Sequence, residues 1–364
     1  MWERSRGLIG GLILAAILVA LHLILNAAGK PFFLTQLTMS MYYAIVVLGL
    51  ALLMGYAGQV SLGHGAFFAI GGYTAAILTT CNLLPWKDCA LVRVLNAAKL
   101  FVMKEDLYGE PMMAFAPWAA FIAAILFTLI VSAFIGYAAL RLKGHYLAMA
   151  TLGFTMIVHR IVLGSEFTGA SDGITSVPPF PLFGELAVAS KSSMRVENYY
   201  IAGILLLVVI VLLWNLLHSR VGRALQAIHD RETAANAMGI NTSQYKLKAF
   251  VVSALLAAVA GVFFTHYTGG IGPSEAGAMK SVRYVALAAA GGMANIWAVA
   301  VTSVSLNFLS LRGWFGTYDD AVFGVILIAI ISIAPEGPAK QVNEWVRRFA
   351  KRPVPETEER DAAA

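Results

Sequence analysis

Residues 219–241, SRVGRALQAIHDRETAANAMGIN, are a charged stretch between two long apolar runs. The stretch has the pattern of a short helix, because its apolar residues fall near one helical face: Leu225, Ile228, Ala235 and Met238. Gly239 is placed to end this helix, and Asn241 or Thr242 is placed to cap the next one. The pattern predicts a polar helix in a loop between two membrane spans.

The composition supports this interpretation. The chain has 364 residues, of which 59% are hydrophobic and 13% are charged, whereas a soluble protein carries roughly 25% charged residues. We therefore predict an all-α fold, a polytopic bundle of transmembrane helices. The net charge of +6 indicates asymmetry between loops and not affinity for nucleic acid, since no basic run is present.

Ten apolar segments are candidate spans, and we expect about 8–10 crossings. They are residues 7–28, 36–54, 62–79, 114–140, 145–163, 199–217, 248–267, 283–295, 297–311 and 318–334. The first is read as a retained span and not as a cleaved signal, because it exceeds the 7–15 apolar residues of a signal core. The short segments in 62–79 and 283–311 are rich in glycine, which predicts broken or re-entrant helices that line a cavity in the protein.

Positive charge predicts the orientation of the chain. With the N-terminus inside, ten crossings place three basic segments inside: residues 141–144, residues 218–247 and the tail after Pro335. Both termini are therefore expected in the cytosol. Residues 1–338 are expected to form the transmembrane domain, and residues 339–364 a partly disordered cytosolic tail.

The expected outside loop, residues 80–113, has balanced charge. Within it, residues 90–104 predict a helix that either lies on the membrane face or packs as a lid on the protein. Cys81 and Cys89 either form one disulfide in this loop or are unrelated small residues, and two cysteines do not make a metal site.

A second informative stretch is GYAGQVSLGHGAFFAIGGYTAA, residues 55–76, which contains six glycines. Glycine permits both backbone breaks and close helix packing. The stretch is therefore either a broken helix whose polar groups face a substrate or a tightly packed helix whose polar groups bind its neighbours. The candidate pathway residues are Gly58, Gln59, Ser61, Gly63 and His64.

Two further breaks follow in the chain. TGASDGITSVPP, residues 168–179, contains the turn signal Asp172-Gly173 and is either an outer gate or an ordinary loop. Gly291-Gly292 interrupts the second half much as the glycine-rich stretch interrupts the first, which is a hint of an internal repeat.

The sequence lacks several chemical signatures. It has no zincin spacing of histidines, no G-x-S-x-G elbow and no Walker A motif, so any ATPase is another chain. Its candidate membrane carboxylates all fall in or next to expected outer loops, which disfavours a proton-coupled carrier: Glu166, Asp172, Glu275, Asp319 and Asp320.

Five stretches together resemble the M-type permease subunit of branched-chain amino-acid ABC importers, a family that also includes urea and amide permeases. They are GYAGQVSLGHGAFFAIGGYTAA, GHYLAMATLGF, TGASDGI, RVGRALQAIHDRETAANAMGIN and GGIGPSEAGAMKS. The resemblance runs in order from about residue 36 to Pro338. It departs from the family pattern at GGMANIWAVAVTS, where a glycine-rich run is usual, and in the long loop 80–113.

The resemblance implies an inner-membrane permease without enzymatic activity or a cofactor of its own. Its implied partners are a second homologous permease, two cytosolic ATP-binding subunits and a periplasmic substrate-binding protein. Residues 222–239 resemble the helix that couples the permease to its ATPases, and the matching positions are Arg223, Ala224, Ala227, Arg231, Glu232, Ala235 and Gly239. The alternatives are a urea or short-amide permease of the same architecture and, less in keeping with the motifs, a self-sufficient secondary carrier.

Overall fold

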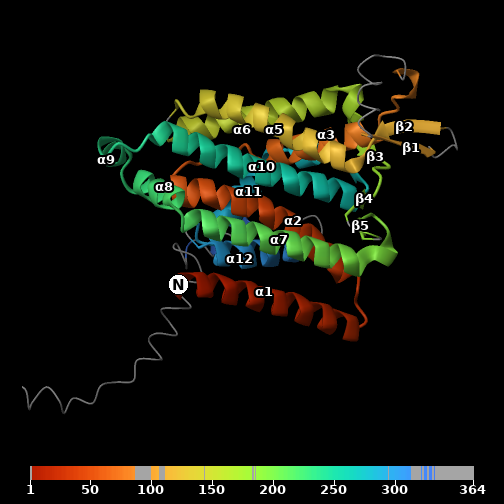
Figure 1. Ribbon diagram of the computed structural model, residues 1–364, viewed down its shortest axis with the longest axis horizontal. Helices are drawn as coiled ribbons and strands as arrows, with labels where there is room; N and C mark the ends of the chain where they lie inside the picture. The colour runs from red at the N-terminus through yellow and green to blue at the C-terminus, as the bar shows by residue number, and fades with distance from the viewer. Residues whose placement is uncertain are drawn as a thin grey trace, which may run out of the picture.

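The computed structural model describes residues 2–86, 100–105, 111–142, 144–182, 184, 186–293, 295–312 and the single positions 321, 324, 325, 328, 329 and 332. These residues form a bundle of helices that run roughly along one axis (Figure 1). Short strands gather at one end of the bundle, and two short helices lie at the other. We refer to these as the hairpin end and the α8 end.

Six helices of the described residues are long and apolar enough to cross a membrane. They are α1 (Trp2–Ala27), α2 (Phe33–Ala51), α5 (Pro117–Ala139), α6 (His145–Gly164), α7 (Arg195–Leu217) and α10 (Thr242–Thr268). Shorter helices complete the bundle: α3 (His64–Thr80), α8 (Arg220–Asp230), α9 (Glu232–Ala237), α11 (Ala278–Ala290) and α12 (Ile296–Leu311). The first nine predicted spans each coincide with one of these helices, whereas the tenth, 318–334, falls almost entirely outside the described residues.

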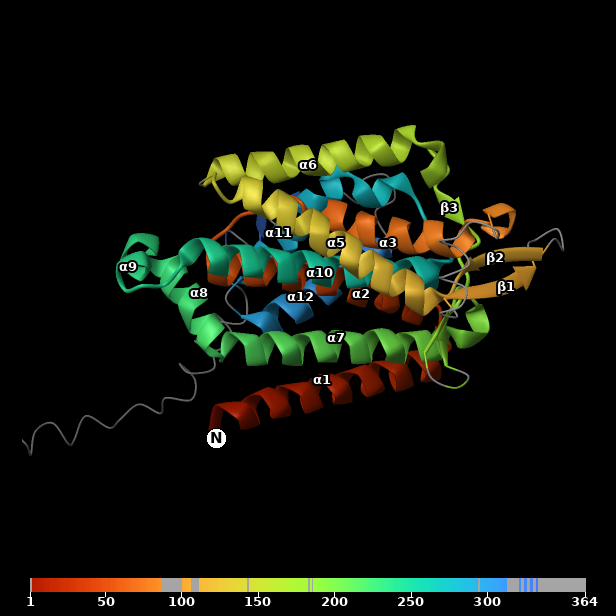
Figure 2. The ribbon, with the colours of Figure 1, turned by 45° about the horizontal axis from the view of Figure 1, so that its top comes forward.

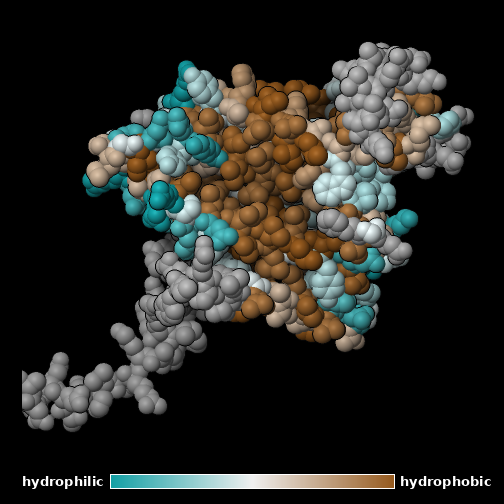
Figure 3. All heavy atoms as spheres, in the orientation of Figure 1, coloured by the Kyte–Doolittle hydropathy of each residue, from teal (hydrophilic) through white to brown (hydrophobic). Residues whose placement is uncertain are grey.

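The hydropathy of the bundle surface is that expected of a protein in a lipid bilayer. On the face shown in Figure 3, an apolar belt crosses the middle, and hydrophilic residues gather at both ends. Helix α6 lies at one edge of the bundle, while α7 and α1 lie at the opposite edge (Figure 2). A belt of this kind is the surface that a lipid bilayer covers.

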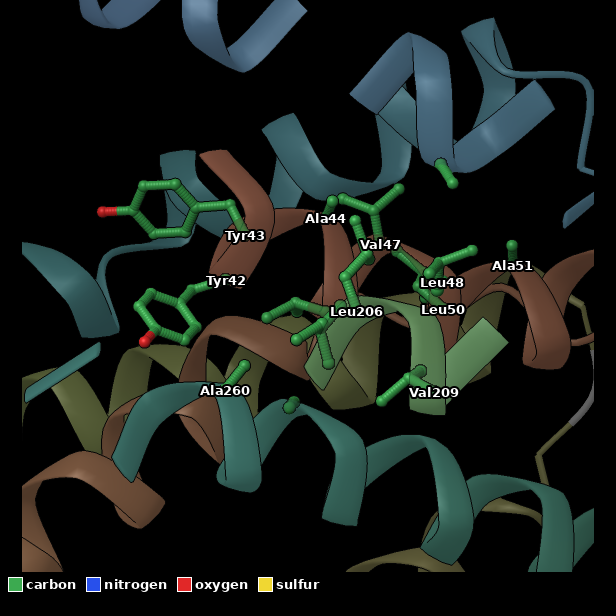
Figure 4. Close-up of a cluster of buried hydrophobic side chains, with 14 of the residues drawn as sticks. Tyr42, Tyr43, Ala44, Val47, Leu48, Leu50, Ala51, Leu206, Val209 and Ala260 are labelled. Carbon is green, nitrogen blue, oxygen red and sulfur yellow. The ribbon is translucent and has the colours of Figure 1, made fainter. Parts of the chain in front are cut away.

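Helix α2 is the centre of the core. Its side chains Tyr42, Ala44 and Leu48 are fully buried, and it packs against α7 through Leu206 and Val209 and against α10 near Ala260 (Figure 4). Small residues let the helices approach closely, since a Cβ on Gly49 would lie 3.0 Å from the Ser253 carbonyl oxygen.

The two glycine-rich regions are breaks, as predicted. After α2 the chain makes one π turn (Leu52–Tyr56), continues without helix through residues 58–63, and starts α3 at His64. In the second half, α11 ends at Ala290 and α12 starts at Ile296, so Gly291-Gly292 lies at the predicted second break. Between α10 and α11 the chain leaves the helix at Gly269 with φ +72 and passes through a short 3-10 turn (Pro273–Ala276) before α11 starts at Ala278. The starts of α3 and α11 meet inside the bundle, where the Gly65 amide donates to Ser281 Oγ at 3.1 Å.

The hairpin end adds strands that the sequence did not predict. β1 (Phe101–Glu105) pairs antiparallel with β2 (Pro111–Phe115), β3 (Ile174–Thr175) with β6 (Gly270–Ile271), and β4 (Phe180–Pro181) with β5 (Ala187–Val188). The expected helix over 90–104 is therefore wrong for residues 101–104, because β2 supplies partners for their backbone groups. Residues 87–99, which include Cys89, and the predicted tail 339–364 lie outside the described residues.

Candidate translocation and coupling site

The stretch 219–241 folds as two helices and not as the single helix predicted over 222–239. Ser219 caps α8 by accepting from the Val221 amide at 3.1 Å. Arg231 is extended (φ −153, ψ 100), so it ends α8 and precedes α9, whose first residue is Glu232. A carboxylate in the first turn favours a helix start, which gives α9 a local reason to begin there.

The break changes which residues are buried. Leu225, Ile228 and Ala235 are buried as predicted, but Met238 is 84% exposed because the second helix turns away. Between α8 and α9 lies an open groove of about 480 Å³, lined by Ala227, Asp230, Arg231, Ala234, Ala235, Met238 and Ile240. The groove thus presents small and apolar side chains beside two charges of opposite sign.

The predicted coupling residues divide into buried and exposed positions. Ala224 and Ala235 are buried and Ala227 is partly buried, whereas Arg223, Arg231 and Gly239 are exposed. Glu232 forms an ion pair with Lys246 at the start of α10, with 2.7 Å between Oε1 and Nζ. This pair ties α9 to a long helix of the bundle.

The predicted ends of this stretch are confirmed. Gly239 follows α9 with φ +83, a conformation that glycine adopts without steric cost. Asn241 caps α10 by accepting from the Gln244 amide at 3.2 Å.

Helix α8 directly touches the first break. Gly58 has φ +66, and a Cβ at this position would lie only 2.9 Å from Nδ1 of His229 on α8. Three residues earlier, a Cβ on Gly55 would lie 2.2 Å from the Met293 carbonyl oxygen, next to the Gly291-Gly292 break. Glycine is thus required where α8 and both breaks come together.

The structure brings the predicted pathway residues together in the interior. Gln59, Ser61 and His64 are 5%, 0% and 1% exposed, and Gly63 is buried while Gly58 is exposed. His64 Nε2 lies 2.6 Å from Ser253 Oγ, which donates to the Gly49 carbonyl at 2.5 Å. The serine therefore accepts from the imidazole, and Nε2 carries the proton.

The backbone of the first break is held by α6. The Leu62 amide donates to Thr151 Oγ1 at 2.9 Å, and Thr155 Oγ1 donates to the Leu62 carbonyl at 2.7 Å. Two side-chain hydroxyls thus satisfy a peptide group that lacks helical partners, which a break at membrane depth requires.

The predicted gate residues Asp172 and Gly173 lie at the hairpin end, where they pack on residues that are distant in the sequence. Asp172 is exposed, and Gly173 (φ +72) approaches the stretch between α10 and α11 so closely that a Cβ would lie 2.3 Å from the Ile271 carbonyl oxygen. The pairing of β3 with β6 extends this contact. Asp172-Gly173 therefore marks a turn that packs on the stretch leading into α11.

Glu275, expected in or next to an outer loop, lies in the nonhelical stretch between α10 and α11. The stretch after α10 turns back into the bundle, so Glu275 is only 9% exposed. It pairs with Lys280, with 2.9 Å between Oε1 and Nζ, and accepts from the Tyr43 hydroxyl at 3.2 Å. In the sequence, the only sign of this ion pair was the spacing of five residues between the two charges. The pairing could not be read from that spacing, because Glu275 lies in a 3-10 turn and Lys280 lies in the helix that follows.

Among the described residues, no group of three or more His, Cys, Asp or Glu is arranged to hold a metal ion.

Comparison with known proteins assigns the family. Residues 32–331 match the family described as the branched-chain amino acid transport system permease component. The chain belongs to this family. The permease is 29% identical over 345 residues to the high-affinity branched-chain amino acid transport system permease protein LivM of Salmonella typhimurium, covering 88% of this chain and 74% of the relative. It is also 29% identical to LivM of Escherichia coli, covering 86% and 73%.

A third relative extends the similarity. The permease is 26% identical over 317 residues to the protein BraD of Pseudomonas aeruginosa, also named a high-affinity branched-chain amino acid transport permease, covering 83% of this chain and 92% of the relative. No solved structure matches the chain. The family match includes both breaks, α8 and α9, so the features that shape the site lie within the shared region.

Proposed function

We propose that this permease is one of two membrane subunits of an ATP-driven importer of branched-chain or related amino acids in the bacterial inner membrane. ATP is hydrolysed on two partner ATPase subunits, and a periplasmic binding protein delivers the substrate to the hairpin end. The α8 end faces the cytosol in this proposal, and both chain termini are cytosolic.

The observation that carries the proposal is the contact of α8 with the first break at Gly58 and His229. The groove between α8 and α9 offers small and apolar side chains with flanking charge, which suits docking against a soluble partner. A displacement of α8 would press on residues 57–63, whose backbone is held by only a few side chains of α6. A partner that docks at the α8–α9 groove can thus act on the pathway residues through α8.

Within this proposal the role of each group follows from its position in the structure. Gln59, Ser61 and His64, with Gly58 and Gly63, form the interior wall of the pathway. Asp172 and Gly173 form part of the outer gate, and Arg223, Arg231, Glu232 and Gly239 set the shape and charge of the docking surface.

Reconstitution tests the proposal. Proteoliposomes that contain this chain, its companion permease and both ATPases should accumulate labelled leucine, isoleucine or valine only with internal ATP and external binding protein. Uptake by this chain alone, driven by an ion gradient, would refute the proposal. Accumulation of urea in place of leucine would identify the short-amide alternative.

A further inference from the structure

We propose that Glu275 and Lys280 form a recognition site for the zwitterionic backbone of the transported amino acid. In the structure the two side chains form an ion pair with each other. In the occupied state, the α-ammonium of the substrate replaces Lys280 on the Glu275 carboxylate, and the α-carboxylate replaces Glu275 on Lys280. This inference rests on the proposed function and adds the substrate class at a defined place.

The geometry of the pair is that of an exchangeable contact. Lys280 Nζ lies 2.9 and 3.2 Å from the two Glu275 oxygens and 3.1 Å from the Tyr43 hydroxyl. Tyr43 in turn donates to both carboxylate oxygens at 3.2 Å. One carboxylate, one ammonium and one hydroxyl therefore form a closed triangle.

Two more buried tyrosines have unused hydrogen-bonding capacity. Tyr284 is 1% exposed and Tyr73 is 3% exposed, and neither hydroxyl has a hydrogen-bond partner among the described residues. Tyr284 lies beside the triangle, with its ring next to that of Tyr43. Buried hydroxyls without partners are rare, and here they supply the extra donors and acceptors that a bound amino acid needs.

Aromatic rings provide an apolar wall beside the charges. The ring of Tyr43 lies 5.8 Å from that of Phe68, 5.2 Å from that of Phe264 and 6.1 Å from that of Tyr284, measured between centroids. An aliphatic side chain attached to the zwitterion would rest on this wall. The arrangement therefore matches both parts of a branched-chain amino acid.

The site can be reached from one side. Glu275 is nearly enclosed, but the Lys280 side chain is 27% exposed, and its neighbours Ser274 and Met279 are exposed. Ser281, the next residue, holds the start of α3 through the Gly65 amide. The pair is thus open to a surface of the bundle and adjacent to the meeting point of the two broken helices.

Electrostatics explains why a zwitterion is selected. Separating a buried ion pair leaves two uncompensated charges, which is strongly unfavourable. A zwitterion compensates both charges at once, whereas a neutral amide or urea compensates neither fully. The closed pair therefore opens for amino acids in preference to uncharged solutes.

The test uses the complete transporter in proteoliposomes and three variants: Glu275→Gln, Lys280→Met and the double variant. Each single variant should lower leucine uptake by about tenfold or more, since it leaves one charge unpaired. The double variant removes both charges together, so it leaves no charge unpaired, but it also removes both partners of the zwitterion. It should therefore remain defective by about tenfold although it folds and assembles with its partner subunits. Glu166→Gln and Lys191→Met remove exposed charges elsewhere and serve as controls at near wild-type uptake.

The outcomes separate the two proposals. Uptake within about twofold of wild type in the double variant would show an ordinary structural ion pair and overturn the recognition site. If the double variant does not fold, Glu275→Asp, which keeps both charges, should raise the KM for leucine more than it changes kcat. An unchanged KM there would also overturn the site. A wild-type complex that carries no branched-chain amino acid would instead refute the proposed function.

Discussion

At the contact between Gly58 and His229, the absence of a Cβ on residue 58 allows two segments of the permease to approach closely. The glycine lies in the left-handed region and lets the imidazole of α8 approach the first break. No larger residue fits both requirements, because the positive φ and the short contact disfavour a side chain independently.

We expect Gly58→Ala to destabilise the protein by about 1–3 kcal/mol through backbone strain and to lower ATP-driven leucine uptake. The added methyl group pushes α8 away from the break. The thermal midpoint of the purified permease and initial uptake rates measure the two effects. Gly153→Ala in α6 is the matched control, since no atom lies within 4 Å of the added Cβ. An uptake defect in the Gly153 variant equal to that of the Gly58 variant would contradict this assignment.

The sequence predicted some of these residues and missed others for a physical reason. Glycine at 58, 173 and 239 signals an unusual backbone, and all three adopt positive φ. The pairing of Glu275 with Lys280 and Tyr43 depends on how a nonhelical stretch turns into the bundle, and 232 residues separate Tyr43 from Glu275. Local patterns contain no information on such a contact.

At the scale of elements, two half-length helices start inside the bundle. The first amides of a helix have no partner within it, and the Gly65 amide of α3 is satisfied by Ser281 of α11. The start of α11 thus satisfies an amide at the start of α3.

Ser281→Ala should therefore destabilise the permease by about 1–3 kcal/mol, the cost of a buried donor without a partner. Thermal unfolding of the purified protein measures this loss. Ser274→Ala removes an exposed hydroxyl from the same stretch and should have little effect. Equal stability of the two variants would show that the Gly65 amide finds another acceptor.

Helices α8 and α9 provide the second test at this scale. Glu232→Arg breaks the ion pair with Lys246 and places a positive charge at the start of α9. Because the pair is partly exposed, we expect only about 0–1 kcal/mol of lost stability but strongly reduced uptake per ATP hydrolysed. Glu197→Arg makes the same charge change in the first turn of α7 at an exposed position. If Glu232→Arg retains wild-type coupling, α9 does not transmit ATPase movement.

The break between α8 and α9 shows where prediction from periodicity ends. Leu225, Ile228 and Ala235 keep helical spacing across Arg231, so the sequence reads as one helix although the backbone there is extended. The helix ends at Ser219, Gly239 and Asn241 were predictable, because capping chemistry is local.

Among the described residues, the face of α11 around Lys280 is a surface that does not suit lipid. Lys280 carries a partly exposed ammonium, and charged groups at membrane depth face protein or water. The neighbouring Met279 is 75% exposed. We infer that this face of α11 is covered by the companion permease or borders the pathway.

A Met279→Cys variant in a background without Cys81 and Cys89 tests this inference. In the assembled transporter its thiol should react with a water-soluble maleimide or cross-link to the companion permease. Leu212→Cys, at a position of α7 that is 58% exposed, should do neither, because a thiol in lipid does not ionise. Reaction of the Met279 variant with lipid-soluble reagents alone would contradict the inference.

The number and order of the membrane helices were largely predictable, because each span is an apolar segment that the local sequence reveals. Segments such as 145–163 and 199–217 differ from α6 and α7 by a few residues at most. The small sheets at the hairpin end were not predictable, since β3 and β6 are two residues long and 94 or more residues apart.

The contact between Gly65 and Ser281 has a consequence for how the protein is made. Ser281 leaves the ribosome 216 residues after Gly65, which corresponds to a delay of roughly 10–40 s at bacterial rates of synthesis. Throughout that interval the first amides of α3 need a temporary partner, from the insertion machinery or from water. We therefore expect the start of α3 to reach its final packing only after the second half of the chain has been made.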